Sequence, residues 1–361
     1  MNDNAPGQSN EKAAAASSLW AVLWHPKARA LYKILIAVAV LVVLYQKGLL
    51  DFSRFKRENL HLGYIAAAGL MLLLVFPVVS WRFHLILNSV GLEATYARAL
   101  QWTMIGEFFS TALPTATGGD LVKAVYAAQA YGKGRRSVAV LAVLTDRAVG
   151  LFGLVTFTLL VCLVGWRTVQ SNPKLTTLTL WLVGVCGVMW IGFWVMIQSW
   201  VERSSWRKAL MGRLPLGDKL EQVYVGLCEM RRHGWRLALV LGLSLANHFL
   251  LCSILLVLAR GLGMELSVME SAVVIPLCMF LNTFGFAGGF GAGELAFEVL
   301  FRSMLGAPEG AGTALAFAFH VLSAGARVLC GLPFYIMAGK PSASLAAGIE
   351  KDESVEPPAG S

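Results

Sequence analysis

Charged side chains are scarce in this sequence. Asp, Glu, Lys and Arg make up 14% of the 361 residues, whereas hydrophobic residues make up 57%. With a mean hydropathy of +0.65, the chain has too little polar surface for a water-soluble globule of this length. The scarcity of charge therefore argues against a soluble protein and predicts one that crosses a membrane several times.

The sequence also lacks the motifs of metal, nucleotide and hydrolase sites. Its six cysteines stand singly, without a C-x-x-C pair, so neither a disulfide framework nor a metal site is supported. No P-loop, H-E-x-x-H or G-x-S-x-G motif occurs, which argues against an ATPase module and against the common hydrolases. We therefore expect no catalytic residues, no metal and no cofactor, and hence a protein that is not an enzyme.

The positive charge lies mostly between apolar runs. A net charge of +9 would suggest a nucleic-acid partner in a soluble chain, but here it is typical of cytoplasmic loops, and no nucleic acid is expected. The basic segments 131–136 and 201–235 are predicted to face the cytoplasm. Segment 261–270 carries only the acids Glu265 and Glu270, and we expect it outside.

Unbroken apolar runs are abundant. They cover residues 30–49, 62–84, 138–166, 175–200, 236–259 and 312–337. Each reaches the ~20 residues that a helix needs to cross ~30 Å of hydrocarbon, so about six full transmembrane helices are predicted in an all-α protein. The first run follows a long polar segment and has no small-residue cleavage site, which favours an uncleaved span over a signal peptide.

Two further runs, 100–131 and 268–305, are each interrupted by a glycine-rich stretch. The stretches end in acids, Asp120 and Glu294. Non-helical backbone at membrane depth is tolerated only where protein or a water-filled cavity surrounds it. With the loop orientation above, the first run is a re-entrant helical hairpin that enters from the cytoplasm, and the second enters from outside. Matching breaks in two inverted halves point to a substrate site.

This pattern predicts one transmembrane domain, 30–340, as an inverted repeat with halves of about 30–170 and 171–340. The polar segments 1–29 and 341–361 are expected to be disordered tails, the first of them cytoplasmic. The cytoplasmic loop 201–235 contains apolar residues at helical spacing that follow an apparent capping box. This amphipathic helix either lies on anionic lipid or packs against the transmembrane bundle.

Charged residues inside the apolar runs are the strongest candidates for a site. Asp146, Arg147 and Arg327 lie well within predicted spans, where each charge costs at least ~2.5–3.5 kcal/mol, so each needs a partner or a cavity. One hypothesis is that the two arginines bind the phosphate of a lipid head group, which a planar guanidinium suits better than an ammonium.

The other hypothesis is that the buried charges form internal ion pairs. Arg147 has Asp120 or Glu107 as partner, and Arg327 has Glu294 or Glu298. Both hypotheses hold together if a substrate phosphate displaces a carboxylate from its arginine.

The acids and glycines of the interrupted runs are further candidates. A carboxylate at the start of a half-helix either caps it or binds protons or cations. Glycines permit close backbone approach and leave amides exposed to an anion. The predicted substrate-binding set includes Asp120 and Glu294 with Gly118, Gly119, Gly288, Gly289 and Gly293. The predicted proton or ion relay residues are Glu107, Asp146 and Glu298, with Asp120 and Glu294 as further candidates.

Several of these motifs resemble the transmembrane-region family of lysylphosphatidylglycerol synthases, which are bacterial and archaeal flippase-like membrane proteins. The resemblance lies in Leu113-Pro114 with Gly118-Gly119-Asp120 and Lys123, in Asp146-Arg147 with Gly150, in the stretch that closes on Glu294, and in Arg327. It covers about residues 30–340. The second stretch departs from the family's Pro-Gly-Gly pattern because no proline occurs between Asn282 and Glu294.

The resemblance implies a stand-alone flippase-like domain without the aminoacyl-transfer domain of some relatives. We expect a protein of the bacterial inner membrane, with both termini cytoplasmic, that moves a lipid head group between leaflets. The lipid is expected to be an anionic phospholipid, a hopanoid or a polyisoprenoid-linked compound. The alternative is a non-transporting accessory subunit of a lipid-modifying or glycosyl-transfer enzyme. The expected partners are membrane lipids and, for the alternative, a lipid-biosynthetic enzyme.

Overall fold

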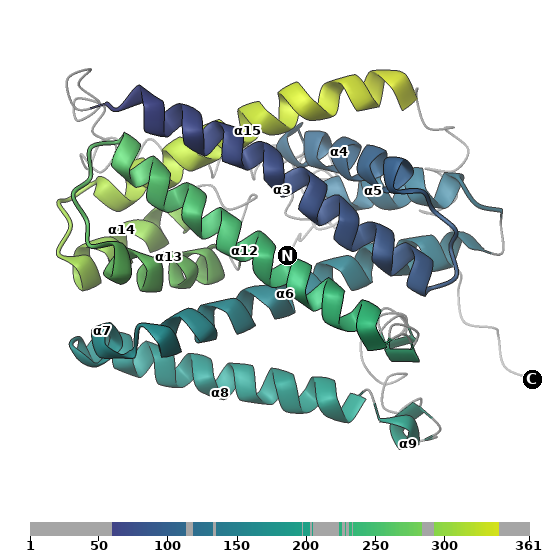
Figure 1. The fold of residues 1–361 in the computed structure, drawn as a ribbon, viewed down its shortest axis with the longest axis horizontal. Helices are drawn as coiled ribbons and strands as arrows, with labels where there is room; N and C mark the ends of the chain where they lie inside the picture. The colour runs from purple at the N-terminus through teal and green to yellow at the C-terminus, as the bar shows by residue number, and fades with distance from the viewer. Residues whose placement is uncertain are drawn as a thin grey trace, which may run out of the picture.

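The computed structural model describes residues 60–112, 118–132, 135–196, 198–202, 234–283 and 292–338, with single positions between 204 and 232. This part of the chain contains helices and no strands (Figure 1). Five of its helices are long and apolar enough to cross a membrane. They are α3 (Leu62–Ser89), α6 (Arg136–Val164), α8 (Pro173–Met196), α12 (Gly234–Gly261) and α15 (Ala311–Ala338). The predicted first span, 30–49, and both predicted tails lie outside the described residues.

Local signals set the ends of these helices. Helix α8 begins with Pro173 at its first position, and the side chain of Asn172 accepts a hydrogen bond from Lys174 N at 3.0 Å, an arrangement that suits a helix start. Helix α3 extends five residues beyond its apolar run and ends before Gly91, whose φ of +79° turns the chain. Arg82 therefore lies inside α3, not at its end.

The two interrupted runs each form a pair of shorter helices. The first pair is α4 (Tyr96–Ala112) and α5 (Gly118–Gln129), and the second is α13 (Val268–Thr283) and α14 (Ala292–Leu305). Within each pair the helices pack against one another. The two pairs lie at opposite ends of the molecule (Figure 1). Residues 113–117 and 284–291, with Gly288 and Gly289, lie outside the described residues.

Helices α3 and α12 lie side by side across the molecule (Figure 1). They run in opposite directions, because His61 N at the start of α3 donates to Gly261 O at the end of α12, 2.9 Å away. Helix α15 packs against both α4 and α14, and α6 packs against α3, α5 and α12. Helix α8 flanks α6 and exposes Trp181, Val188 and Ile191, as expected of a lipid-facing helix.

Two short helical elements flank α8. Helix α7 (Trp166–Gln170) joins α6 to α8, and α9 (Ser199–Glu202) follows α8. In the amphipathic loop, Tyr224 and Cys228 are buried in a cluster with Val201, against which Val195 packs. At these two positions the segment packs against the end of α8. Most other positions of the loop lie outside the described residues.

Candidate functional site

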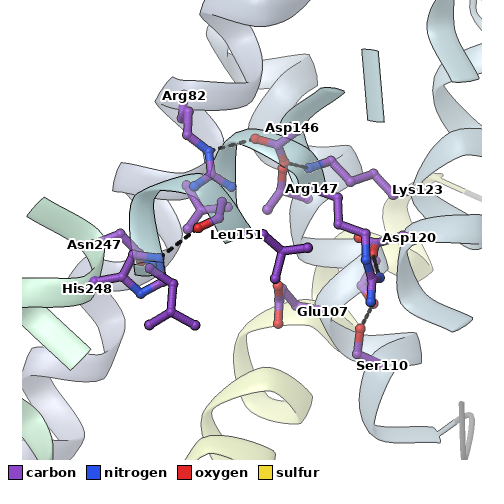
Figure 2. A pocket seen from close by; sticks show the side chains of 15 residues that line it. Arg82, Glu107, Ser110, Asp120, Lys123, Asp146, Arg147, Leu151, Asn247 and His248 are labelled. Atoms are coloured by element: carbon purple, nitrogen blue, oxygen red, sulfur yellow. Dashed lines mark hydrogen bonds and ion pairs between the residues drawn. The ribbon is translucent and has the colours of Figure 1, made fainter. Parts of the chain in front are cut away.

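A polar cavity of about 300 Å³ lies between α3, α4, α5, α6 and α12. Figure 2 shows the charged side chains that line it. Four of the predicted site residues are among them: Glu107, Asp120, Asp146 and Arg147. The structure therefore brings together acids from both helices of the first pair and the charged pair of α6.

Asp146 is the centre of a buried ion cluster. Its Oδ1 accepts a hydrogen bond from Nε of Arg82 at 2.7 Å, and its Oδ2 accepts one from Nζ of Lys123 at 2.9 Å (Figure 2). Arg82 also donates to Oγ of Ser244 on α12 at 3.1 Å. The Lys123 ammonium lies 3.6 Å from the centre of the Phe83 ring, a contact that favours a cation.

Two cations thus share one carboxylate in this cluster. Arg82, Lys123 and Asp146 are 6%, 4% and 6% exposed, so water screens their charges little. Burying a charge costs several kcal/mol unless a counter-charge compensates it. With two cations and one carboxylate, the cluster carries one positive charge in excess. This excess favours an anion in the cavity.

Arg147 projects from the next position of α6 and forms an ion pair with Asp120. Asp120 lies in the first turn of α5, where the positive end of the helix dipole also favours a carboxylate. The side chains of this pair are 35% and 41% exposed. Asp120 is one of the two partners predicted for Arg147, and that ion-pair prediction is confirmed.

Arg327 pairs with a different acid from those predicted. Its Nε lies 2.9 Å from Oε2 of Glu107 on α4, whereas Glu294 or Glu298 of its own half was expected. The reason is the packing of α15 along α4. At Gly331, one turn after Arg327, an added Cβ would lie only 2.6 Å from the carbonyl oxygen of Met104. Both predicted arginines therefore reach acids of the α4–α5 pair.

The acids of the second pair have other partners. Glu294 is fully buried, and its Oε1 lies 2.9 Å from Nδ1 of His320. Glu298 accepts hydrogen bonds from the backbone amides of Gly310 and Thr313 at 2.8 and 3.2 Å. It therefore caps the start of α15 with its carboxylate. Neither acid lines the cavity.

The predicted glycines that the structure describes lie at helix starts. Gly118 and Gly119 are buried in the first turn of α5, and Gly293 is buried in the first turn of α14. An added Cβ at Gly119 would lie 1.8 Å from Oγ of Ser110 and 2.3 Å from O of Gly106. Gly119 thus allows α4 and α5 to touch backbone to backbone.

Two residues of the ion cluster were not predicted as site residues. Arg82 lies two residues before the end of the apolar run 62–84, where a basic residue is typical of a helix flank. Lys123 belongs to the Gly118-Gly119-Asp120 motif that carries the family resemblance, but the sequence predicted no function for its side chain. Its spacing of three from Asp120 puts both on one face of α5, and that spacing is the signal that would have found it.

Among the residues that the structure describes, no group of three or more His, Cys, Asp or Glu side chains gathers as metal ligands would. The family model described as "Lysylphosphatidylglycerol synthase TM region" matches residues 30–331. This range includes every residue that lines the cavity. No curated protein and no solved structure gives a significant match.

Proposed function

Since the chain belongs to the lysylphosphatidylglycerol synthase transmembrane-region family, we propose that it moves a lipid with an anionic head group between the leaflets of its membrane. The family, together with the five long apolar helices in the part of the chain that the structure describes, makes it a multi-pass membrane protein related to lipid handling. Its action is transport, without chemical change to the lipid. The observation that best supports the proposal is the excess positive charge of Arg82 and Lys123, which share the Asp146 carboxylate beside the cavity.

The helix pairs support an inverted repeat with two re-entrant hairpins. Helix α4 has 17 residues and α13 has 16, so each is at most ~26 Å long and short of the ~30 Å that a full span needs. The pairs lie at opposite ends of the molecule, and α3 and α12, the helices that precede them, are antiparallel (Figure 1). The distribution of charge indicates that the end of the molecule with α5 and the basic segment 131–136 is cytoplasmic. In this topology the membrane is the bacterial inner membrane, and both termini lie on its cytoplasmic side.

The partly exposed ion pairs provide a route for the head group. The Arg147–Asp120 and Arg327–Glu107 pairs are only part-buried, so an arginine exchanges a carboxylate for a lipid phosphate without a large new desolvation cost. A guanidinium binds either oxyanion through two parallel N–H donors. The carboxylate that is released is then free to accept a proton, which gives Asp120 and Glu107 a place in coupling to protons.

Lipid movement in proteoliposomes tests this proposal. With a fluorescent anionic phospholipid and a quencher of the outer leaflet, the wild-type protein should accelerate exchange. Arg147→Ala and Arg327→Ala should each slow it about tenfold or more, because each removes a cation that the phosphate meets. Arg302→Ala is the matched control, since Arg302 forms an exposed ion pair with Glu309 and should keep the wild-type rate.

Equal rates for the wild type and both arginine variants would contradict the proposed route. No acceleration of any anionic or isoprenoid-linked lipid by the wild type would contradict transport itself. In that case the accessory-subunit alternative would be preferred, and co-purification of a lipid-biosynthetic enzyme would be the next measurement.

A further inference from the structure

The wall of the cavity that α4 and α12 contribute carries polar atoms without partners. They are Oγ1 of Thr103, Oδ1 of Asn247 and Nδ1 of His248, and no other atom of the described chain hydrogen-bonds to them. The three residues are 2%, 7% and 8% exposed, and all line the cavity. A buried polar atom left unpaired costs about 1–3 kcal/mol, and native proteins satisfy nearly all of them. These atoms therefore point to an occupant of the cavity.

The hydrogen-bonding character of this wall follows from His248. Its Nε2 lies 3.0 Å from the carbonyl oxygen of Gly150, and because a carbonyl only accepts, Nε2 carries the hydrogen. When the ring is uncharged, Nδ1 is then an acceptor. Oδ1 of Asn247 is an acceptor as well. The occupant must therefore offer hydrogen-bond donors on this side.

The acceptor wall and the ion cluster meet at Gly150. An ideal Cβ built on Gly150 would lie 3.4 Å from Nη2 of Arg82, while the carbonyl of the same residue faces His248. In Figure 2, Asn247 and His248 lie on one side of the cavity, and Asp120, Lys123 and Arg147 lie on the other. If Arg82 and Lys123 bind the anionic group of a ligand, a short substituent on that group reaches the acceptor atoms of Asn247 and His248.

The volume of the cavity is large enough for a small head group. A cavity of about 300 Å³ equals the share of liquid volume of about ten water molecules. This is enough for a phosphate ester head group of roughly ten non-hydrogen atoms, with the acyl chains left in the bilayer.

We infer that the cavity recognises a phosphodiester with one negative charge and an uncharged, hydroxylated end, such as glycerol or a sugar, and that it selects against head groups with an ammonium. This inference rests on the proposed function and adds the chemistry of the head group. The phosphate compensates the excess charge at Arg82 and Lys123, and the hydroxyls donate to Asn247 and His248. An ammonium adds positive charge to a site that already has too much.

A panel of four lipids tests the selectivity. They share acyl chains and a chain-borne label and differ in head group: phosphatidylglycerol, phosphatidylmethanol, phosphatidylethanolamine and the lysyl ester of phosphatidylglycerol. The glycerol lipid should move about tenfold faster than the methyl lipid, which has the charge but lacks hydroxyls. It should also move about tenfold or more faster than either lipid with an ammonium.

Two variants test the acceptor wall and the ion cluster separately. Asn247→Leu should bring the ratio of glycerol to methyl lipid rates close to one. Ser253→Ala should keep the wild-type ratio, because Ser253 lies on the same helix away from the cavity and its hydroxyl donates to Phe249 O. Lys123→Met removes the excess charge and leaves Asp146 paired with Arg82. It should narrow the ratio of glycerol to ethanolamine lipid rates. Thermal unfolding of each variant confirms that it is folded before its rates are compared.

Failures of the inference and of the proposed function can be told apart. Transport of all four lipids at one rate, or equal slowing of the glycerol and methyl lipids by Asn247→Leu, would overturn the inference and leave transport standing. If no lipid moves, transport fails, and calorimetric titration with soluble glycerophosphoglycerol and glycerophosphoethanolamine decides the recognition. If only the glycerol ester binds, and Asn247→Leu abolishes this binding, the natural ligand is a soluble phosphodiester with the same head group rather than a lipid. Binding of neither ester would overturn the inference too.

Discussion

At the scale of single residues, Asp146 determines the charge balance of the cavity. Asp146→Asn leaves the buried cations of Arg82 and Lys123 without a carboxylate. Breaking a buried pair in this way typically costs about 3–5 kcal/mol. We expect a loss of stability of that order, measured by thermal or chemical unfolding of the purified protein in detergent.

The partner residue gives the control for this prediction. Adding Lys123→Met to Asp146→Asn removes one of the two uncompensated cations, so the double variant should be more stable than Asp146→Asn alone. The coupling free energy should fall in the range of about 0.5–3 kcal/mol that contacting residues show. If Asp146→Asn unfolds as the wild type does, the cluster does not need its carboxylate, and the charge argument is wrong.

The same residues show what sequence can and cannot reveal. The Arg147–Asp120 pair was among the predicted ones because both residues lie in motifs of one half of the chain that carry the family resemblance, and an arginine within a membrane span needs an acid as partner. Arg82 was missed because the apolar run appeared to end beside it, whereas α3 continues to Ser89. The acid that pairs with Arg327 depends on which helix packs on α15, and no residue spacing encodes that contact.

At the scale of helices, the close approach of α4 and α5 depends on Gly119. A Cβ at this position would meet the carbonyl oxygen of Gly106 at 2.3 Å as well as the Ser110 hydroxyl. A hydroxyl can rotate away, but backbone cannot. Gly119→Ala should therefore push the two helices apart and lower stability by about 1–3 kcal/mol, the usual cost of overpacking.

Gly184→Ala is the matched control for this change. Gly184 lies within α8, and no atom lies within 4 Å of an added Cβ there. Since alanine favours a helix over glycine by up to ~1 kcal/mol, this variant should be at least as stable as the wild type in the same unfolding assay. Similar losses for both variants would show that α4 and α5 tolerate the extra methyl group.

Helices were also the level at which the sequence was most informative. Apolar runs of about 20 residues or more predicted the existence and type of every long helix that the structure describes, because hydrocarbon leaves a spanning segment few alternatives to a helix. Helix ends were less predictable. Turn residues such as Gly91 decide them locally, and a polar residue near an end does not mark where hydrogen bonding stops.

At the scale of the whole molecule, the proposed inverted repeat makes a specific prediction for the two faces of the membrane. If α4–α5 re-enters from one face, the segments before α4 and after α5 lie on the same side. If α13–α14 re-enters from the other face, the segments before α13 and after α14 lie together on the opposite side. A pair that crossed the membrane fully would instead place its two flanking segments on different sides.

Four single-cysteine variants show on which side of the membrane each flanking segment lies. In a Cys330→Ala background, where the other native cysteines are buried, Glu93→Cys and Gly132→Cys flank the first pair, while Ser267→Cys and Glu309→Cys flank the second. All four positions are exposed. With a membrane-impermeant maleimide, we expect the first two to react only in inverted vesicles and the second two only in intact cells. Reaction of Glu93→Cys and Gly132→Cys on different sides would mean that α4 and α5 do not form a re-entrant hairpin, and the inverted repeat would be wrong even if lipid transport were observed.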